Sequence, residues 1–509
     1  MGCKAGARRG KRRPRGRLGV LGRRPRGHPY PNDRARAHPP LELRCLVPPN
    51  HPRRGRGAGG GPVKVGIVGA GVAGLAAARV LRDLGHEVVI FEGRDEVGGQ
   101  VVTFPVGGEE LECFYHHIFT SDTTVIRYIE ELGLGQYLRW IEPRNAHFVR
   151  GRMYPFVTPL DLLRFTAIPL TSRIRLGLAA LWLRRRADGV RRYEGVTARD
   201  WMLRAVGQKA FDAFWGPLLK GKFADQADQV GMVWLWNKIY LRFASRKGGS
   251  SKEVLGYLEG SFKRYYRALA DRLEGQGVAI RLRTPVETVV SEGGRVTGLR
   301  AAGTFHPFDA VLLTVPNVIA LKIAPDLPAA YRAVLERVRY QWATCLVLAL
   351  DRPLTPYYWL SIGDDLPFVA CIEHTNFMPP ERYGGNHVVY LSNYTAPDHP
   401  VLQMDADAVF AHYLDGIRRL NPAFDPSWVR EKWFFKDPGG QPVITTFYSR
   451  SIPDMRTGIE GLYLSNTTQV YPEDRGQNYS LLLGEKAGRL IHDDSVRTEP
   501  GRASQFQSG

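Results

Sequence analysis

The sequence contains few cysteines and no long uncharged apolar run. Its five cysteines, in 509 residues, are Cys3, Cys45, Cys113, Cys345 and Cys371, and no two of them form a C-x-x-C pair. This spacing indicates neither a zinc site nor a disulfide framework, and it fits a reducing cytoplasm. No stretch of 18 uncharged apolar residues occurs, so we predict no transmembrane helix. Neither an internal repeat nor a catalytic triad is evident.

Acidic residues are scarce in the leader, residues 1–62, which has 17 Lys and Arg against two acids, Asp33 and Glu42. The leader therefore carries +15 of the chain's +20 charge, and the remainder only +5. Its Arg, Pro and Gly content predicts disorder, as does the composition of 496–509. A nucleic-acid or anionic-membrane arm is one interpretation, but Tyr30 is its only aromatic residue, and we predict no nucleic-acid partner. A mis-assigned start codon, with Val63 as the alternative start, is simpler, and we expect the leader to be dispensable.

A dinucleotide-binding pattern begins directly after the leader. Lys64–Val68 reads as a short buried strand, and Gly69, Gly71 and Gly74 follow with G-x-G-x-x-G spacing at the start of an Ala- and Leu-rich helix. A second strand ends at Glu92. In this β-α-β unit the glycines allow a tight turn, close approach to a pyrophosphate and close helix packing, and the carboxylate accepts hydrogen bonds from a ribose.

Two further segments distinguish FAD from NAD. "GRDEVGG" places Gly98 and Gly99 soon after Glu92, and "GLYLSNTTQVYPEDRGQNYSLLLGEKAGRLI" near the C-terminus predicts a strand, a loop and a helix returning to the first domain. With these motifs the chain resembles the flavoprotein amine oxidase superfamily, which includes monoamine oxidases, protoporphyrinogen oxidase and phytoene desaturases. The match is specific over 65–99 and looser over 63–495.

The resemblance implies an FAD cofactor and a set of residues that bind it. These are Gly69, Ala70, Gly71, Ala73, Gly74, Glu92, Gly93, Arg94, Gly98, Gly99, Gln100, Val286, Asn466, Gln477, Asn478 and Tyr479. Gln100 stands where the family often has Arg. Asn466 stands where the family often has a carboxylate. The Asn466 amide or the neighbouring Thr hydroxyls can replace the hydrogen bonds of that carboxylate.

The resemblance also implies that the helix beginning near Asn478 directs its positive end at the flavin N1–C2=O edge. Arg475, just before it, adds a full charge in one interpretation. In the other it is a solvated loop residue or pairs with Glu473 or Asp474. His116 and His117, in "ECFYHHIF", fall where the family chain passes the flavin ring. They are candidates for acid–base catalysis, or else a packed, hydrogen-bonded pair; no further ligands suggest a metal site.

The predicted fold class is α/β, a discontinuous Rossmann-like FAD-binding domain with an inserted α+β substrate domain. The FAD-binding domain is expected in three pieces, at 63–150, 256–321 and 453–495. Between them lie a helical insert at 151–255 and a segment of strands with one helix at 322–452. In that segment "VITTFYS" reads as a strand and Asp405 as a helix N-cap.

Two basic stretches of the insert have structural and functional interpretations. Arg173–Arg186, apolar with basic ends, is either an ordinary packed helix, which we favour, or a peripheral contact with an anionic membrane. Trp234, Lys238 and Arg242 lie at helical spacing. A solvated helix face is favoured for them over contact with an anionic substrate or membrane.

The predicted function is an FAD-dependent oxidoreductase that takes a hydride from a small organic substrate onto flavin N5 and passes electrons to oxygen, a quinone or another acceptor. The alternative is a flavin isomerase resembling UDP-galactopyranose mutase. Amine oxidation is the second alternative. Gly476 and Pro442 stand where monoamine oxidases place tyrosines, and no lysine around 343–345 matches the lysine that those enzymes direct at the flavin. Binding proteins that resemble the fold without flavin chemistry are disfavoured by the intact glycines and Glu92. The sequence predicts no oligomeric state.

Overall fold

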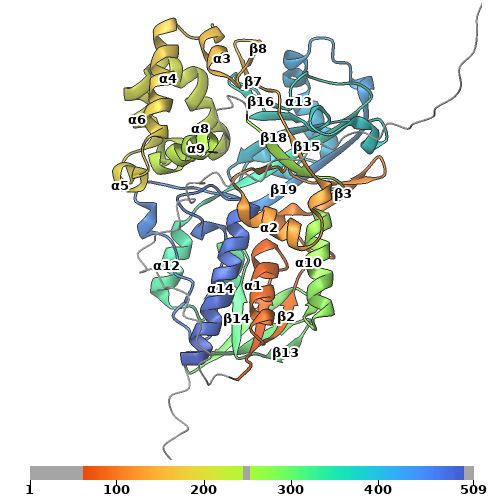
Figure 1. Cartoon of the computed structure of the whole chain (residues 1–509), viewed down its shortest axis with the longest axis vertical. Helices are drawn as coiled ribbons and strands as arrows, with labels where there is room; N and C mark the ends of the chain where they lie inside the picture. The colour runs from red at the N-terminus through yellow and green to blue at the C-terminus, as the bar shows by residue number, and fades with distance from the viewer. Residues whose placement is uncertain (1–60, 245–252, 498–509) are drawn as a thin grey trace, which may run out of the picture. The chain divides into compact units, whose positions relative to one another are not determined.

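The computed structural model describes residues 61–244 and 253–497 (Figure 1). Apart from residues 61 and 62, the predicted disordered leader lies outside the described residues. The C-terminal tail was predicted to be disordered from 496, but the last helix continues to Arg497, and only the residues from 498 lie outside the described ones. Among the helices of the described chain, none is both long enough and apolar enough to cross a membrane.

A five-stranded parallel sheet is assembled from three separate parts of the chain. Its strands, in spatial order, are β10 (Ala279–Arg281), β2 (Glu87–Phe91), β1 (Lys64–Val68), β14 (Ala310–Leu313) and β20 (Leu462–Leu464). All neighbouring strands pair in parallel. Because both faces are covered, β1, β2 and β14 read as nearly continuous buried runs rather than alternating ones. This sheet confirms the predicted discontinuous Rossmann-like fold.

Helices α1 (Val72–Asp83) and α14 (Gln477–Arg497) lie side by side on this sheet (Figure 1). Gly484 lies against Ala73, and Gly488 against Ala77, so the two helices run in the same direction. Both N-termini therefore lie at the same edge of the sheet, where the parallel strands end. A third helix, α10 (Lys263–Gly275), packs on α1.

A seven-stranded sheet lies in the substrate-side segments. Its strands, in spatial order, are β19 (Val429–Pro442), β15 (Tyr340–Leu350), β18 (His387–Thr395), β17 (Ala370–Glu373), β16 (Trp359–Ile362), β7 (Asn145–Val149) and β8 (Arg152–Pro155). Strand β7 precedes position 150, the predicted end of the first FAD-binding piece, yet it pairs in this sheet. The domain boundaries themselves stay predictions.

The prediction of a strand over "VITTFYS", residues 443–449, was wrong. Strand β19 ends at Pro442, and Val443 and Ile444 are buried in the core of the helical insert instead. Thr445 forms only an isolated bridge with Val230. Packing against the insert therefore overrides the local β-propensity of this stretch.

The first insert is mostly helical, as its pattern predicts. Its helices are α3 (Pro159–Arg164), α4 (Leu170–Arg184), α5 (Gly189–Tyr193), α6 (Ala198–Val206), α7 (Gln208–Ala210), α8 (Gly216–Phe223) and α9 (Met232–Ala244). They share an aromatic-rich core that includes Trp236 and Phe223.

Smaller elements complete the described chain. The strands are β3 (Thr103–Val106), β4 (Glu109–Glu112), β5 (Ile118–Phe119), β6 (Leu138–Ile141), β9 (Leu255–Leu258), β11 (Val286–Glu292), β12 (Arg295–Ala301) and β13 (Thr304–Pro307). The helices are α2 (Thr123–Glu131), α11 (Asn317–Ile323), α12 (Ala329–Arg337) and α13 (Ala406–Leu420). Asp405 caps α13 by accepting a hydrogen bond from the Ala408 N–H at 2.8 Å, which confirms its predicted role.

Candidate active site

The glycine-rich turn between β1 and α1 leaves a helix N-terminus open. Gly69 has φ +106°, and its N–H donates to the Phe91 carbonyl oxygen at 2.8 Å. A Cβ at Gly74 would collide with the Gly69 carbonyl oxygen. Helix α1 begins after Gly71 with no side-chain cap. Its first-turn N–H groups and dipole thus offer an anion site of the kind that a pyrophosphate fills.

The predicted glycine doublet lies directly against this turn. The Gly98 N–H donates to the Ala70 carbonyl oxygen at 3.0 Å, and Gly71 pairs with Gly98 in a short bridge. A Cβ at Gly99, which has φ +62°, would lie only 3.0 Å from the Gly71 Cα. Position 99 therefore requires glycine both for its backbone conformation and for this approach, whereas a Cβ at Gly71 would make an ordinary contact of 3.6 Å with the Gly99 Cα.

Glu92 is placed at the end of β2, where its carboxylate faces the turn. Its Oε2 accepts from the Ala70 N–H at 2.8 Å and its Oε1 from the Arg94 N–H at 3.0 Å. The half-buried carboxylate keeps further lone pairs for a ribose diol. Gly93 packs against Pro285, which precedes Val286. Val286, the predicted adenine contact, therefore lies near Glu92.

Arg94 and Gln100 reach toward the seven-stranded sheet. Arg94 donates to the Gly99 carbonyl oxygen at 2.7 Å and lies 3.8 Å from the Asp437 carboxylate. Gln100 Nε2 donates to the Gly439 carbonyl oxygen at 2.8 Å and to Asp437 Oδ1 at 3.1 Å. These two side chains tie the glycine doublet to β19, and their role toward a cofactor stays a prediction.

The start of α14 carries an unsatisfied buried donor. Gln477 Oε1 accepts from Tyr265 OH at 2.9 Å and Tyr266 OH at 2.5 Å, whereas its Nε2 is buried and has no partner among the described residues. A Cβ at Gly476 would meet open space. Because buried polar groups are nearly always paired, this donor and the space beside Gly476 fit a bound molecule.

Asn478 and Asn466 are already committed to protein partners. Asn478 Oδ1 accepts from the Thr124 and Val125 N–H groups at 2.9 and 3.3 Å, which caps α2. The Asn466 amide donates to Val315 and Asn317 and accepts twice from Thr468. The Asn466 amide is thus occupied at both its nitrogen and its oxygen, whereas Asn478 has only its oxygen engaged in these bonds. The predicted cofactor contacts of both residues stay predictions. The next residue of α14, Tyr479, is half-buried, and burial raises the pKa of its phenol.

Arg475 is not a solvated loop residue, nor does it pair with Glu473 or Asp474. Its Nε donates to Gln441 Oε1 at 3.1 Å and its NH2 group to Tyr394 OH at 3.2 Å. Gln441 and Tyr394 come from β19 and β18, so Arg475 sits where the seven-stranded sheet meets α14. No carboxylate of the described residues lies within ion-pair distance of it.

Asp474 instead binds two lysines of the helical insert. Lys222 and Lys238 Nζ each lie 2.7 Å from Asp474 Oδ2, and Trp234 Nε1 donates to Oδ1 at 3.0 Å. Burial opposes ionisation of Asp474, but the two ammonium groups hold its pKa well below the usual range. Burial lowers the pKa of Lys238 to about 8, although Asp474 counteracts it. The prediction of a solvated face for Trp234 and Lys238 was wrong.

The two histidines are held as neutral, hydrogen-bonded rings. His116 Nδ1 lies 2.6 Å from the Phe114 carbonyl oxygen, and His117 Nδ1 lies 3.0 Å from Tyr358 OH. Burial lowers the pKa of His116 to about 4, helped by Arg475. Burial lowers the pKa of His117 to about 3, helped by Arg242 and Lys238. Both rings are therefore poor proton donors near pH 7.

Four residues of this region had no signal in the sequence: Lys222, Tyr266, Tyr394 and Gln441. Each acts through a partner far away in the chain, such as Asp474, Gln477 or Arg475. The described chain contains no group of three or more His, Cys, Asp or Glu that could hold a metal ion.

Comparison with known proteins decides the family. The sequence profile of the family described as "Flavin containing amine oxidoreductase" matches residues 72–472. The chain belongs to this flavin-containing amine oxidoreductase family. Membership confirms the resemblance stated above and the flavin cofactor that the open α1 terminus and the orphan Gln477 donor fit.

Individual relatives of the family are distant. The zeta-carotene desaturase of Synechocystis is 29% identical over 308 residues, 55% of this chain and 61% of that protein. Amine oxidase [flavin-containing] B of Sus scrofa is 25% identical over 301 residues, 53% of this chain and 54% of that protein. The match thus spans little more than half the length of these relatives. A crystal structure of reduced UDP-galactopyranose mutase aligns over 86% of this chain and 98% of its own, with TM-score 0.67 and 17% identity, which establishes the shared fold alone.

Proposed function

We propose that this member of the flavin-containing amine oxidoreductase family is an FAD-dependent oxidoreductase that removes a hydride from a small organic substrate. The observation that carries the proposal is the parallel pair α1 and α14, whose N-termini lie at one edge of the sheet. One N-terminus suits a pyrophosphate and the other a group that becomes negative on reduction.

Each cofactor contact is assigned to a part of this edge. The α1 N-terminus and the Gly98–Gly99 doublet would hold the pyrophosphate, Glu92 the ribose, and the backbone near Val286 the adenine. Gln477 and Tyr479 would start the helix that faces the flavin. When bound, FAD would supply the two-electron acceptor, with oxygen, a quinone or another compound reoxidising it.

The substrate side would use charge and alignment rather than proton transfer. Arg475 places a guanidinium between α14 and the ends of β18 and β19, where it favours negative charge. Half-buried, neutral His116 and His117 would orient the substrate and exclude water rather than act as acids. The hydride transfer itself needs no general base, since a hydride leaves with both electrons of its bond; the proton that the substrate also loses when a double bond forms would pass to water.

The deciding experiment is anaerobic mixing of the oxidised flavoprotein with porphyrinogens, polyenes, simple amines and sugar nucleotides, each alone. We expect an unsaturated or porphyrinogen substrate to bleach the absorbance near 450 nm. Bleaching by simple amines alone would overturn the substrate preference. Sugar-nucleotide isomerisation that requires prior reduction and gives no net electron transfer would replace the oxidoreductase with a mutase.

A further inference from the structure

Helix α4 is apolar on both sides but buried on only one. Leu176, Ala179 and Leu183 pack into the core of the helical insert. The other side, spaced by three and four residues, is exposed: Leu170, Ile174, Leu178, Leu181 and Trp182. Leu178 retains 61% of its surface in contact with solvent. A helix on the surface needs only one apolar side to pack on its own core, so the second apolar side of α4 is left without a cover in the described chain.

The exposed apolar surface extends onto α3. Leu162 lies against Gly177 of α4, which places Leu160 and Leu163, both 50% exposed, beside the same surface. We call the seven exposed side chains between Leu160 and Trp182 the α3–α4 face. They make up half of the fourteen large apolar side chains that are exposed in the described chain. Scattered exposed leucines are ordinary, but a contiguous group of this size marks an interaction surface.

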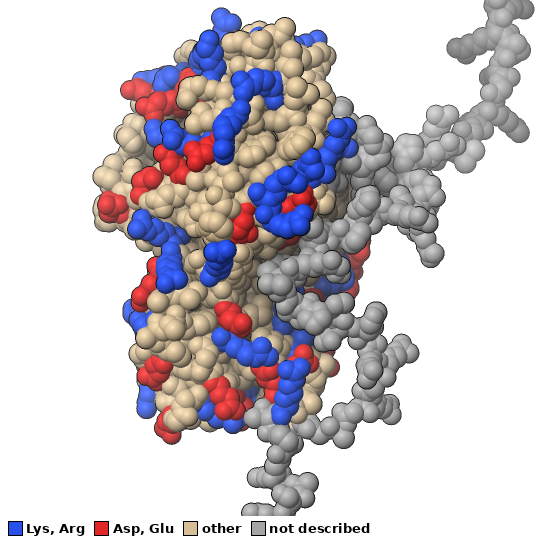
Figure 2. Space-filling model, turned by 90° about the vertical axis from the view of Figure 1, so that its left-hand side faces the viewer, with Lys and Arg blue, Asp and Glu red and all other residues tan. Residues whose placement is uncertain are grey.

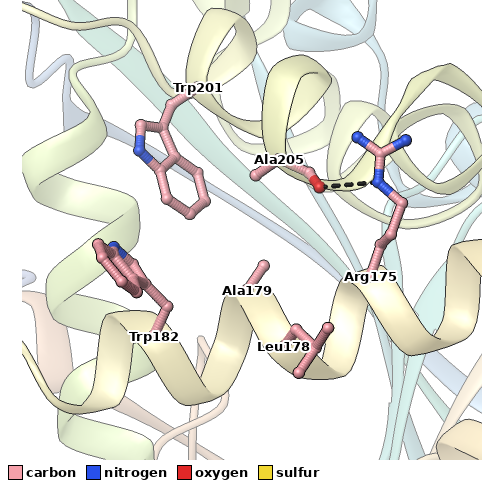
Figure 3. Close-up of a pocket in the computed structure, with 6 residues that line it drawn as sticks. All are labelled: Arg175, Leu178, Ala179, Trp182, Trp201 and Ala205. Atoms are coloured by element: carbon pink, nitrogen blue, oxygen red, sulfur yellow. Dashed lines mark hydrogen bonds between the residues drawn. The ribbon is translucent and has the colours of Figure 1, made fainter.

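A hollow of about 310 Å³ opens beside this face, between α4 and α6. Leu178, Ala179 and Trp182 line it from α4, and Trp201 and Ala205 from α6 (Figure 3). Figure 3 shows the two indole rings on one side of the hollow and Arg175 on the other. The hollow is therefore an apolar recess with a cation at its margin.

The segment that carries the α3–α4 face is strongly basic. Residues 159–186 contain six arginines and a single acid, Asp161. Asp161 is used in the capping box of α3. Arg175 donates to the carbonyl oxygens of Arg204 and Ala205, so its charge is not paired with a carboxylate there. Figure 2, which turns this side of the molecule to the viewer, shows tan surface in its upper half bordered by blue side chains, with red ones beside some of them.

The apolar surface and the arginines around it together indicate what kind of partner can cover the α3–α4 face. The leader, with its net charge of +15, is repelled by a basic face. A second copy using the same face would bring arginines against arginines. An occupant that is apolar inside and negative outside satisfies both features, and a bilayer with anionic headgroups has this character.

We propose that the α3–α4 face docks on a membrane containing anionic lipids. Helix α4 lies parallel to the surface, with Ile174, Leu178 and Leu181 among the acyl chains. Trp182, over whose ring the Arg186 guanidinium stacks at 4.1 Å, sits at the headgroup level, where amphipathic rings and arginines are favoured. The hollow beside α4 receives part of one acyl chain.

The test measures partitioning of the full chain onto phosphatidylcholine vesicles with and without phosphatidylglycerol, by flotation. We expect binding that requires the anionic lipid. Leu178→Glu and Arg185→Glu should each lower the partition coefficient by about tenfold or more, since each charge near such a surface changes binding by about fivefold. Retained flavin and melting temperature show that each variant is folded.

Matched variants elsewhere serve as controls. Phe305→Glu changes an exposed aromatic residue of β13, and Arg418→Glu reverses an exposed charge on α13. Both should bind like the unchanged protein, and the leader is present in every sample. Equal binding by all variants would assign any membrane affinity to another part of the chain. Absence of vesicle binding, or loss of a dimer in Leu178→Glu, would overturn the proposal in favour of a protein partner.

Discussion

Gly484 of α14 lies so close to Ala73 of α1 that a Cβ at position 484 would collide with the Ala73 carbonyl oxygen. The residue pair fixes the separation of the two helices whose N-termini form the candidate cofactor site. Van der Waals contact between a glycine and a neighbouring backbone cannot relax by a rotamer change, so a larger residue must displace one helix.

We therefore expect Gly484→Ala to lower the free energy of unfolding by about 2 kcal/mol, as overpacked cores do, and to weaken flavin binding in parallel. Thermal melting and a flavin titration measure the two effects. Gly275→Ala at the end of α10 is the control, because a Cβ there would meet no atom within 4 Å. A Gly484→Ala protein with unchanged melting and flavin affinity would show that α14 does not need this close approach.

Glu92→Ala should weaken FAD binding by about 1–3 kcal/mol, the range for a charge-assisted hydrogen bond to a ribose together with support of the Ala70 N–H. Fluorescence of free flavin during dilution reports the affinity. Glu87→Ala, at the start of the same strand, removes a partly exposed ion pair with Lys64 and should leave the affinity unchanged. Equal FAD affinity in both variants would show that the Glu92 carboxylate does not bind the ribose.

Asp474→Asn should destabilise the protein by about 1–3 kcal/mol, because it leaves two half-buried ammonium groups without their carboxylate. Lys222→Met removes only one of the two cations and leaves Asp474 paired with Lys238, so the loss should be clearly smaller. Urea unfolding of both variants tests this order. If Lys222→Met proves the more damaging change, the lysine has a role beyond neutralising Asp474.

The buried carboxyl group of Glu112 should make the free energy of unfolding depend on pH. Burial raises the pKa of this carboxyl from 4.5 to about 7, although it accepts hydrogen bonds from the Phe262 N–H and Tyr257 OH. Between these pH values the native protein holds a proton that the unfolded chain has lost. The free energy of unfolding therefore falls as pH rises from 4.5 to about 7.

Glu112→Gln removes this titration. The free energy of unfolding of the variant minus that of the unchanged protein should therefore be larger at pH 8 than at pH 5, by up to about 3 kcal/mol. Urea unfolding at the two pH values gives the difference. A variant whose stability differs from that of the unchanged protein by the same amount at both pH values would mean that Glu112 ionises normally in the folded chain.

Local sequence patterns were sufficient for the first β-α-β unit. The glycine spacing, the helix that ends before Gly85 with φ +90°, and the strand before Glu92 all follow from short-range rules. The cap at Asp405 is equally local. The late strand and helix, β20 and α14, were also readable from their own segment, whereas the family resemblance supplied the residues expected to contact the flavin.

Long-range partners explain where prediction failed. The spacing of Trp234 and Lys238 is typical of a surface helix, and only the distant Asp474 makes that surface an interior. At α4 the predicted packed helix is confirmed by Leu176, Ala179 and Leu183, but the leucines of its other side, which have helical spacing too, are exposed. Sequence periodicity reports which side chains are apolar, but the tertiary fold decides which of them are covered.

The order in which strands are made differs from the order in which they lie in the five-stranded sheet. Strand β1 is synthesised early. The edge strand β20 of its sheet and the helix α14 that packs beside α1 follow only after about 390 further residues have been added. A nascent chain therefore exposes the apolar side of α1 throughout most of translation. The two helix ends that would hold the cofactor come together only when the last helix has left the ribosome, so flavin capture is a late event in biosynthesis.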